Sequence, residues 1–226
     1  MKVSIIVPVY NEEKNIKNCL DSLIKQEEKP EEIIIVDNNC TDKTFDIVKK
    51  YPGIIIIKEK KQGIAHARNA GFNTANGDIL AKCDADTILP TGWIKKVKKA
   101  FTKKKDIVAY VNHFIIYDIA VVNRIILFSY LYQWFFKIIG GYYILLGPAL
   151  AIRKITWQKI KNQVCVDDKL AHEDIDLSIH VSPYGKIFLD KSININISGR
   201  RMKYNPLSFF IEYPFILLKM LKNHRL

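Results

Sequence analysis

Short runs of consecutive apolar residues divide the first half of the chain. They cover residues 3–9, 32–36, 54–57 and 79–83 and are rich in isoleucine and valine. Unbroken apolar runs of this length are typical of strands that are buried on both faces. Between the runs, apolar residues recur at helical spacing, so strands and helices alternate. This alternation predicts an α/β fold whose mostly parallel sheet has helices on both faces.

Two helix boundaries can be predicted from polar residues and glycines. Asn11 is expected to cap the first helix, with Glu12 in its first turn. A later helix is expected over residues 64–75, with Gly77 as its stop. In sheets of this kind, ligands lie beyond the carboxyl ends of the strands. The residues that follow the predicted strands are therefore the first candidates for a functional site.

The fourth apolar run ends in two carboxylates, Asp84 and Asp86, which are separated by Ala85. Residues two apart on a strand point to the same face, so these two side chains can converge. Such a pair suits a divalent cation that keeps some waters and is shared with substrate phosphates. The alternative is an ordinary turn after a strand, where Asp is common. The carboxyl-end rule places both acids in one crevice with residues 8–11 and 37–42.

From residue 107 onward the pattern changes. A strand is expected over residues 107–111, but residues 125–152 then carry a single charge, Lys137. A membrane span needs about 20 apolar residues, so the length permits one here. The alternative, a buried or interfacial segment, is favoured by the turn-forming pairs that begin at Gly140 and Gly147. A single span would also put the acids before and after it on opposite sides of a bilayer.

The remaining segments continue the α/β pattern up to an amphipathic tail. Strands are expected over residues 147–152, 186–189 and 193–197, and helices over residues 153–160 and 175–179. The tail, residues 206–226, mixes aromatic and basic residues. Two interpretations stay open for it: a helix in a membrane interface, attracted to anionic lipid, or a segment that packs against the rest of the protein.

Charge and cysteine content narrow the partners and the setting. With 35 Lys and Arg against 23 Asp and Glu, the net charge of +12 favours nucleic acid, acidic lipid or a phosphorylated small molecule as a partner. No DNA- or RNA-binding module is recognised in the sequence, so nucleic acid is not expected. The four cysteines lack C-x-x-C spacing, which argues against a zinc site or a disulfide framework and favours a reduced, cytoplasmic setting.

Five stretches, in this order along the chain, resemble motifs of the family 2 glycosyltransferases with the GT-A fold. They are residues 3–12, Ile35-Val36-Asp37 with Thr41-Asp42, residues 63–71 with Arg68-Asn69-Ala70-Gly71, Asp84-Ala85-Asp86, and Glu173-Asp174. The resemblance implies an α/β fold with a Rossmann-like nucleotide-binding sheet flanked by helices. It also implies a single domain over residues 1–205, with a nucleotide-sugar-binding half at 1–112 and an acceptor-side half at 113–205.

The resemblance assigns roles to individual residues. Those expected to bind the nucleotide sugar are Pro8, Val9, Tyr10, Glu12, Asp37, Arg68, Asp84, Ala85 and Asp86. Asp37 is similar to the acid that accepts a hydrogen bond from the base. Asp86 is similar to the acid that holds Mg²⁺ or Mn²⁺ against the donor diphosphate, and Asp84 is expected to contact ribose or the waters of the metal. Arg68, one turn beyond Gly63, is expected either to meet the diphosphate or to be a solvated helix residue.

The remaining chemistry concerns the leaving group and the acceptor. Asp174 is similar to the acid that serves as the general base, with Asp167 and Asp168 as competitors for that role. Arg200 and Arg201 are candidates for binding phosphate. A cation and an arginine would stabilise the charge that develops on the leaving diphosphate, and one carboxylate would accept the proton of the attacking hydroxyl.

Two departures from the family pattern limit what can be carried over. The family's acidic turn, Asp-Asp-Gly-Ser-Thr-Asp, has Asn38 in place of its second acid. This change leaves the contacts to the base and ribose open. No convincing Gln-x-x-Arg-Trp motif follows Asp174, which argues against a processive polysaccharide synthase.

The resemblance thus implies an inverting, metal-dependent glycosyltransferase that moves one sugar from a UDP-, GDP- or TDP-sugar. The expected acceptor is a hydroxyl or phosphate of a glycan or of a polyprenyl-linked molecule. The alternative is a non-catalytic protein that binds nucleotide sugars or anionic surfaces. The expected location is the cytoplasm, and peripheral contact with the inner face of the cell membrane is a further hypothesis.

Overall fold

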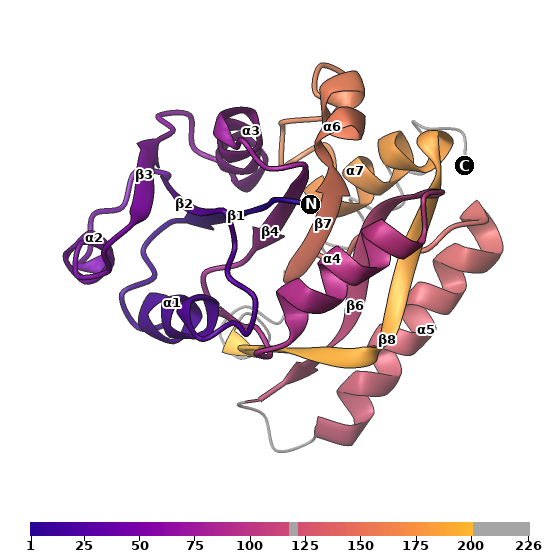
Figure 1. Cartoon of the computed structure of the whole chain (residues 1–226), viewed down its shortest axis with the longest axis horizontal. Helices are drawn as coiled ribbons and strands as arrows, with labels where there is room; N and C mark the ends of the chain where they lie inside the picture. The colour runs from indigo at the N-terminus through magenta and orange to yellow at the C-terminus, as the bar shows by residue number, and fades with distance from the viewer. Residues whose placement is uncertain (118–121, 201–226) are drawn as a thin grey trace.

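Figure 1 shows the computed structural model of the chain, which describes residues 1–117 and 122–200. One eight-stranded sheet runs through it in the order β3-β2-β1-β4-β7-β6-β8-β5. The strands are β1 (Val3–Val9), β2 (Glu32–Asp37), β3 (Ile54–Lys58), β4 (Ile79–Cys83), β5 (Thr87–Ile88), β6 (Ile107–Ile116), β7 (Ala149–Arg153) and β8 (Lys186–Ile197). The helices are α1 (Ile16–Ile24), α2 (Thr44–Val48), α3 (Ile64–Thr74), α4 (Trp93–Lys103), α5 (Val122–Gly140), α6 (Lys154–Ile160) and α7 (Glu173–Val181), followed by a short 3-10 helix, Ser182–Tyr184.

Strands β1 to β4 form a parallel half of the sheet. β1 lies between β2 and β4, and β3 pairs with the other side of β2. Val9 lies opposite Asp37 where β1 pairs with β2, and Ile6 lies opposite Lys82 where β1 pairs with β4. Parallel strands need crossover connections, which the intervening helices supply. The predicted alternation is therefore confirmed here, and the carboxyl ends of β1, β2 and β4 meet at one edge.

The second half of the sheet has mixed strand directions. β7 runs antiparallel to both β4 and β6, whereas β6 and β8 run parallel to each other. The two strands predicted at residues 186–189 and 193–197 are one strand, β8, so that prediction is wrong. The register between β6 and β8 shifts between Asn112 and His113. A bulge of this kind accommodates extra residues without ending a strand, which is why the break in the apolar pattern was misleading.

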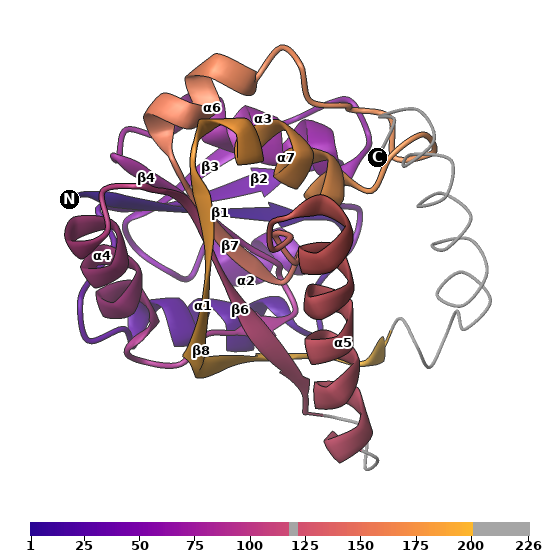
Figure 2. The ribbon, with the colours of Figure 1, turned by 90° about the vertical axis from the view of Figure 1, so that its right-hand side faces the viewer.

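Each face of the sheet carries its own hydrophobic core. Ile6 and Leu80 pack on the face that α3, α6 and α7 cover. Ile5 and Ala81 pack on the opposite face with α1 and α4. Figure 2 shows α3, α6 and α7 above the sheet and α1 below it. Successive strand residues point to opposite faces, so the unbroken apolar runs fill both cores.

The first helix begins later than predicted. Its N-cap is Asn15, so the prediction that Asn11 caps it is wrong. Asn11 instead has a φ angle of 53°, in the left-handed region that Asn tolerates better than most residues. Its Oδ1 accepts a hydrogen bond from the Thr41 N–H at 2.8 Å. Asn11 therefore turns the chain beyond β1 and ties it to the loop after β2.

Helix α3 ends before the predicted stop. Its last residue is Thr74, and Ala75 is already extended, so Gly77 lies outside the helix. Gly77 is needed for close packing, because a Cβ there would lie 2.6 Å from Ser4 Oγ. A larger residue would push the start of β4 away from β1.

Helix α5 lies along β6 (Figure 2). Gln133 ties it to the segment that follows through two hydrogen bonds with the backbone of Ile144, at 2.8 and 3.1 Å. On the outer side Leu131, Trp134 and Ile138 are exposed. Across residues 1–117 and 122–200, no helix combines the length and apolar character that crossing a membrane requires. The predicted tail, residues 206–226, lies outside the described residues.

Candidate active site

A cavity of about 530 Å³ opens beyond the carboxyl ends of β1 and β4. The lining residues come from the loops after β1, β2 and β4, from the start of α3, and from two later segments of the chain. They are Pro8, Val9, Tyr10, Asn11, Glu12, Asn38, Gln62, Gly63, Ile64, Ala67, Asp84, Ala85, Asp86, Asp168 and Arg200. The predicted donor-binding residues are thus brought together around one cavity, except for Asp37 and Arg68.

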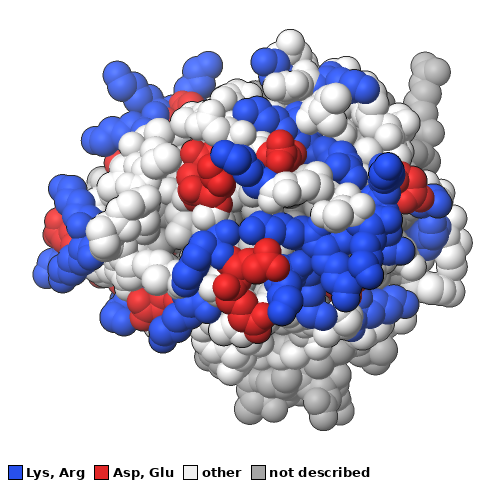
Figure 3. Space-filling model, viewed as in Figure 1, with Lys and Arg blue, Asp and Glu red and all other residues white. Residues whose placement is uncertain are grey.

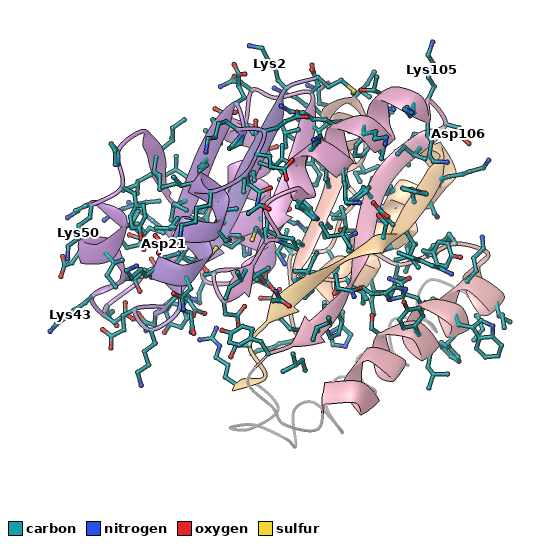
Figure 4. All side chains as sticks on the ribbon, turned by 60° about the horizontal axis from the view of Figure 1, so that its bottom comes forward. Lys2, Asp21, Lys43, Lys50, Lys105 and Asp106 are labelled. Atoms are coloured by element: carbon teal, nitrogen blue, oxygen red, sulfur yellow. The ribbon has the colours of Figure 1, made fainter. Side chains whose placement is uncertain are left out.

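The charge of the cavity is opposite to that of the molecular surface. Figure 3 shows Lys and Arg gathered over α4, and the exposed side chains of Lys43, Lys50 and Lys105 point away from the protein (Figure 4). The cavity lining instead holds four carboxylates and one arginine, namely Glu12, Asp84, Asp86, Asp168 and Arg200. A phosphorylated ligand would need an additional cation to bind beside so many acids.

Asp37 lies beside the cavity and is largely buried, at 8% exposure. Its Oδ1 accepts a hydrogen bond from the Cys40 N–H at 3.0 Å, and its Oδ2 lies 3.8 Å from Lys58 Nζ. The carboxylate thus stabilises the turn after β2. Its predicted contact with a nucleotide base stays a prediction.

Asn38, which replaces the family's second acid, has a structural role that an acid could not fill. Its amide nitrogen donates to the carbonyls of Glu59 and Lys61 at 2.9 and 2.7 Å. Its Oδ1 accepts the Gly63 N–H at 2.9 Å. A carboxylate has no donor to offer these carbonyls. Asn38 therefore connects the loop after β2 to the segment that leads into α3.

Asp86 faces the cavity next to Arg200. The guanidinium of Arg200 donates from Nε to Asp86 Oδ2 at 3.1 Å and also pairs with Glu12. These two acids already hold one cation between them, so their position fits a metal ion of the predicted kind. No cluster of three or more His, Cys, Asp or Glu side chains suited to a metal occurs within the described ranges. A metal at Asp86 would therefore need phosphate oxygens and waters as its other ligands, as Mg²⁺ commonly has. Arg201, the second predicted phosphate ligand, lies outside the described residues.

A buried ionic network, which the sequence interpretation missed, lies behind Asp84. Lys82 is fully buried, and its Nζ lies 2.8 Å from Asp84 Oδ1 and 2.6 Å from Glu173 Oε1. Burial lowers the pKa of Lys82, but the two carboxylates outweigh it and raise the pKa above its usual value. For the acid Glu173 burial acts in the opposite direction and raises the pKa, but Lys82 and Arg68 outweigh it and lower the pKa to about 2. Lys82 and Glu173 are therefore both charged at neutral pH. In the sequence, the signal for this network was the single lysine within the otherwise apolar run 79–83.

Arg68 belongs to this network and does not line the cavity. It is fully buried, and its Nη1 donates to the backbone carbonyl of Glu173 at 2.8 Å and pairs with the Glu173 carboxylate. Both earlier interpretations of Arg68, a solvated helix residue and a residue at the crevice that meets a diphosphate, disagree with this placement. The reason is packing, because Arg68 lies on the side of α3 that faces the sheet and α7.

Asp174 lies in the first turn of α7, close to Asp84. Its Oδ2 accepts the Gly147 N–H at 3.0 Å, and its Oδ1 accepts the N–H of Ile175 at 2.8 Å. A Cβ on Gly147 would lie 3.3 Å from Asp174 Oδ2 and 3.9 Å from Asp84 Oδ2, so the two acids flank this glycine. Burial and the charge of Glu173 raise the pKa of Asp174. A carboxylate with a raised pKa is suited to accepting a proton.

The competing acids are placed differently. Asp168 lines the cavity, and its Oδ2 accepts the N–H of Ile64 at the start of α3, at 3.1 Å. Burial is also the main cause that raises its pKa. Asp167 is exposed and caps the backbone N–H of Lys169 at 2.9 Å. Of the three, Asp174 is the acid that Gly147 places next to Asp84.

Comparison with known proteins identifies the family of the chain and its fold. The model of the family described as glycosyl transferase family 2 matches residues 4–157. Glycosyltransferase GlyA of Streptococcus pneumoniae is 31% identical over 117 residues, which cover 50% of this chain and 17% of that protein. The dolichol-phosphate mannosyltransferase of Pyrococcus furiosus is 33% identical over 112 residues, covering 47% of this chain and 32% of that protein. The chain thus spans a third or less of the length of these relatives.

Two solved structures share the fold at low sequence identity. TarS of S. aureus, residues 1–349, is 21% identical, with a TM-score of 0.67, and the match covers 98% of this chain and 66% of that one. The mannosyltransferase PcManGT from Pyrobaculum calidifontis, solved with GDP-Man and Mn²⁺, is 18% identical, with a TM-score of 0.77 and coverage of 99% and 64%. The family match spans well over half of the sequence, and these neighbours have the GT-A fold that the sheet shows. The chain therefore belongs to glycosyltransferase family 2.

Proposed function

We propose that this protein transfers one sugar from a nucleotide-sugar donor to a hydroxyl or phosphate acceptor, with inversion at the anomeric carbon. One observation carries the proposal: Asp174 lies across Gly147 from Asp84, and Asp84 lines the cavity together with Asp86. Most of the proposed donor-binding residues come from the first half of the chain, whereas the proposed base and Arg200 come from the second. This division corresponds to a donor half at residues 1–112 and an acceptor-side half at residues 113–205.

The chain's own residues can supply the base and a cationic contact to the leaving group. The acceptor oxygen attacks the anomeric carbon as the bond from that carbon to the diphosphate oxygen breaks, and Asp174 takes the acceptor's proton. The Gly147 N–H holds Asp174 Oδ2 in place. Arg200 lies beside Asp86 and Glu12, where its guanidinium could contact the leaving diphosphate. A single displacement of this kind needs no covalent nucleophile and inverts the configuration.

A divalent cation, Mg²⁺ or Mn²⁺, is part of the proposal. Asp86 would hold it, and when bound it would neutralise the charge that develops on the leaving diphosphate. The excess of carboxylates over cations in the cavity lining supports this requirement. The structural neighbour PcManGT, solved with GDP-Man and Mn²⁺, offers further support for the cation, and TarS, solved with UDP-GlcNAc, supports a nucleotide-sugar donor.

Donor binding and turnover can be tested separately. Thermal shifts with UDP-, GDP- and TDP-sugars, with and without Mn²⁺, identify the donor. Asp174→Asn should then keep donor binding and lose turnover by a factor of about 100 or more. Asp46→Asn, an exposed acid on α2, is the matched control and should behave as the wild type.

The outcomes separate the alternatives. If Asp168→Asn abolishes turnover and Asp174→Asn does not, Asp168 is the base. If the wild type binds nucleotide sugars but neither hydrolyses nor transfers them with any acceptor tested, the non-catalytic binding protein is the better description. If no nucleotide sugar shifts the melting temperature, the whole proposal fails.

We also propose that α5 rests on an anionic membrane, which would bring a polyprenyl-linked acceptor to the site. Trp134, Phe135 and Ile138 are exposed on its outer side, and aromatic residues of this kind favour the membrane interface. The net charge of +12 adds attraction to acidic lipid.

Flotation with vesicles of phosphatidylglycerol and phosphatidylcholine measures the membrane contact. The double variant Trp134→Ser, Ile138→Ser should lose binding to these vesicles. Ile155→Ser on α6, equally exposed, serves as the control and should keep it. Equal flotation of the double variant and the wild type would refute contact through α5.

A further inference from the structure

Lys82 is the one charged residue in β4, and its side chain is fully buried. Its strand neighbours Leu80, Ala81 and Cys83 are also fully buried. Lysines are rarely buried, because removing an ammonium group from water is costly unless the charge is paired and hydrogen-bonded. An apolar residue would fit the sequence pattern of this strand better. The presence of Lys82 therefore calls for an explanation from its contacts.

The ammonium group of Lys82 has three N–H donors and three oxygen partners. These are Asp84 Oδ1 at 2.8 Å, Glu173 Oε1 at 2.6 Å and the backbone carbonyl of Gly147 at 3.0 Å. An ammonium offers three donors, so its capacity is fully used. The reaction proposed above assigns no task to this group.

The three partners lie on the two sides of the proposed reaction. Asp84 lines the donor cavity. Gly147 holds Asp174, because its N–H donates to Asp174 Oδ2 at 3.0 Å while its carbonyl accepts from Lys82. Glu173 precedes Asp174 in the first turn of α7 and is also held by Arg68. One buried ammonium thus contacts the donor-side acid and both segments that position the proposed base.

We propose that Lys82 is a positioning residue that fixes the distance between Asp84 and Asp174. It contacts neither donor nor acceptor. It acts by holding Asp84 from one side, and the Gly147 backbone and the start of α7 from the other. This inference rests on the proposed function for its catalytic meaning. Its structural part, that Lys82 holds Asp84 and Asp174 at their spacing, can be tested without measuring sugar transfer.

Lys82→Met keeps the length of the apolar stem and removes the ammonium. Misplacement of reacting groups by about 1 Å can cost a factor of about 100 in rate, so turnover of the folded variant should fall about 10- to 100-fold. Donor binding, measured by calorimetry, should change less than turnover, because Asp86, Glu12 and Arg200 are untouched. Lys95→Met is the matched control, since Lys95 is exposed and pairs only across the surface with Glu27 at 3.2 Å. It should keep the wild-type turnover.

A second variant and a double-mutant cycle separate positioning from stability alone. Lys82→Gln keeps a hydrogen-bond donor without the charge and serves if Lys82→Met does not fold. All rates are measured well below each variant's melting temperature. If Lys82 acts through Asp84, the effect of Lys82→Met should be at least about threefold smaller in an Asp84→Asn background than in the wild type. Equal effects in both backgrounds, or wild-type turnover in a folded Lys82 variant, would overturn the proposal.

A crystal structure of the folded Lys82 variant gives a readout that does not depend on the reaction. The expected result is that Asp84 moves relative to Gly147 and Asp174, with the hydrogen bond from Gly147 N–H to Asp174 lengthened or lost. Unchanged positions of all three would overturn the inference even if the wild type proves to be a transferase. Conversely, a wild type that transfers no sugar refutes the proposed function, while displaced acids in the variant still support the positioning role.

Discussion

Replacing Glu173 by Gln removes one charge from the buried network and leaves the side-chain volume almost unchanged. The wild-type carboxylate accepts from Lys82 Nζ at 2.6 Å and pairs with Arg68, and both cations are fully buried. In the variant, Lys82 keeps Asp84 as a carboxylate partner, whereas Arg68 loses the carboxylate with which it pairs. Removing one partner of a buried ion pair typically costs about 3–5 kcal/mol. A large loss of stability is therefore expected.

The pKa of Glu173 gives a second route to the magnitude. Burial raises it, but Lys82 and Arg68 outweigh burial and lower the pKa from 4.5 to about 2. A carboxyl whose pKa falls this far on folding contributes about 3 kcal/mol to the free energy of unfolding at neutral pH. Because the pKa is lowered, this contribution is complete well above pH 4.5 and is lost as the pH falls toward 2. Both routes predict that Glu173→Gln costs about 3 kcal/mol at pH 7.

Urea unfolding followed by far-UV circular dichroism measures this cost. Glu27→Gln, which breaks the exposed pair with Lys95, is the matched control and should change the free energy of unfolding by less than about 0.5 kcal/mol. The difference between Glu173→Gln and the wild type should narrow when the pH is lowered from 7 to 3. A difference below about 1 kcal/mol at pH 7, or one that does not depend on pH, would refute the reasoning.

Three further outcomes are expected at the site. Gly147→Ala places a methyl group 3.3 Å from Asp174 Oδ2, so kcat should fall about tenfold, and a wild-type kcat would show that the site tolerates the crowding. Burial and the charge of Glu173 raise the pKa of Asp174 above the usual 3.8 of an aspartate, so kcat should fall as the pH drops through this raised pKa. A profile of kcat against pH that falls only at or below pH 3.8 would contradict the assignment of Asp174 as the base. Arg200→Met removes the cation beside Asp86, so calorimetry without donor should find tighter Mn²⁺ binding, whereas weaker binding would mean that Arg200 does not compete with the metal.

Much of the donor side could be predicted from local sequence patterns. The apolar runs of β1 to β4 each lie within a few residues of their observed ends, since a strand buried on both faces leaves a continuous signal. The carboxyl-end rule then brought residues 8–11 and 84–86 to one cavity, which the structure confirms. These predictions depend on short-range patterns and on one general rule of sheet topology.

The network behind Asp84 could not be predicted in the same way. Lys82 is visible as an exception in an apolar run, but its partners Gly147 and Glu173 lie 65 and 91 residues further along the chain. Their approach depends on β7 running antiparallel to β4, which no local pattern indicates. Arg68 was misplaced for a related reason, because the direction of an arginine on a helix depends on what covers that helix.

The antiparallel direction of β7 also bears on how the chain folds. Residues 1–112 contain every strand of the parallel half, and they also contain Lys82, whose full set of oxygen partners arrives only with Gly147 and Glu173. Until β7 pairs with β4, one edge of β4 and a buried ammonium remain incompletely satisfied. During synthesis, the amino-terminal half should therefore stay loosely packed around β4 until α7 has been made. The completion of the contacts around Lys82 and the approach of Asp174 to Asp84 would then be the same event.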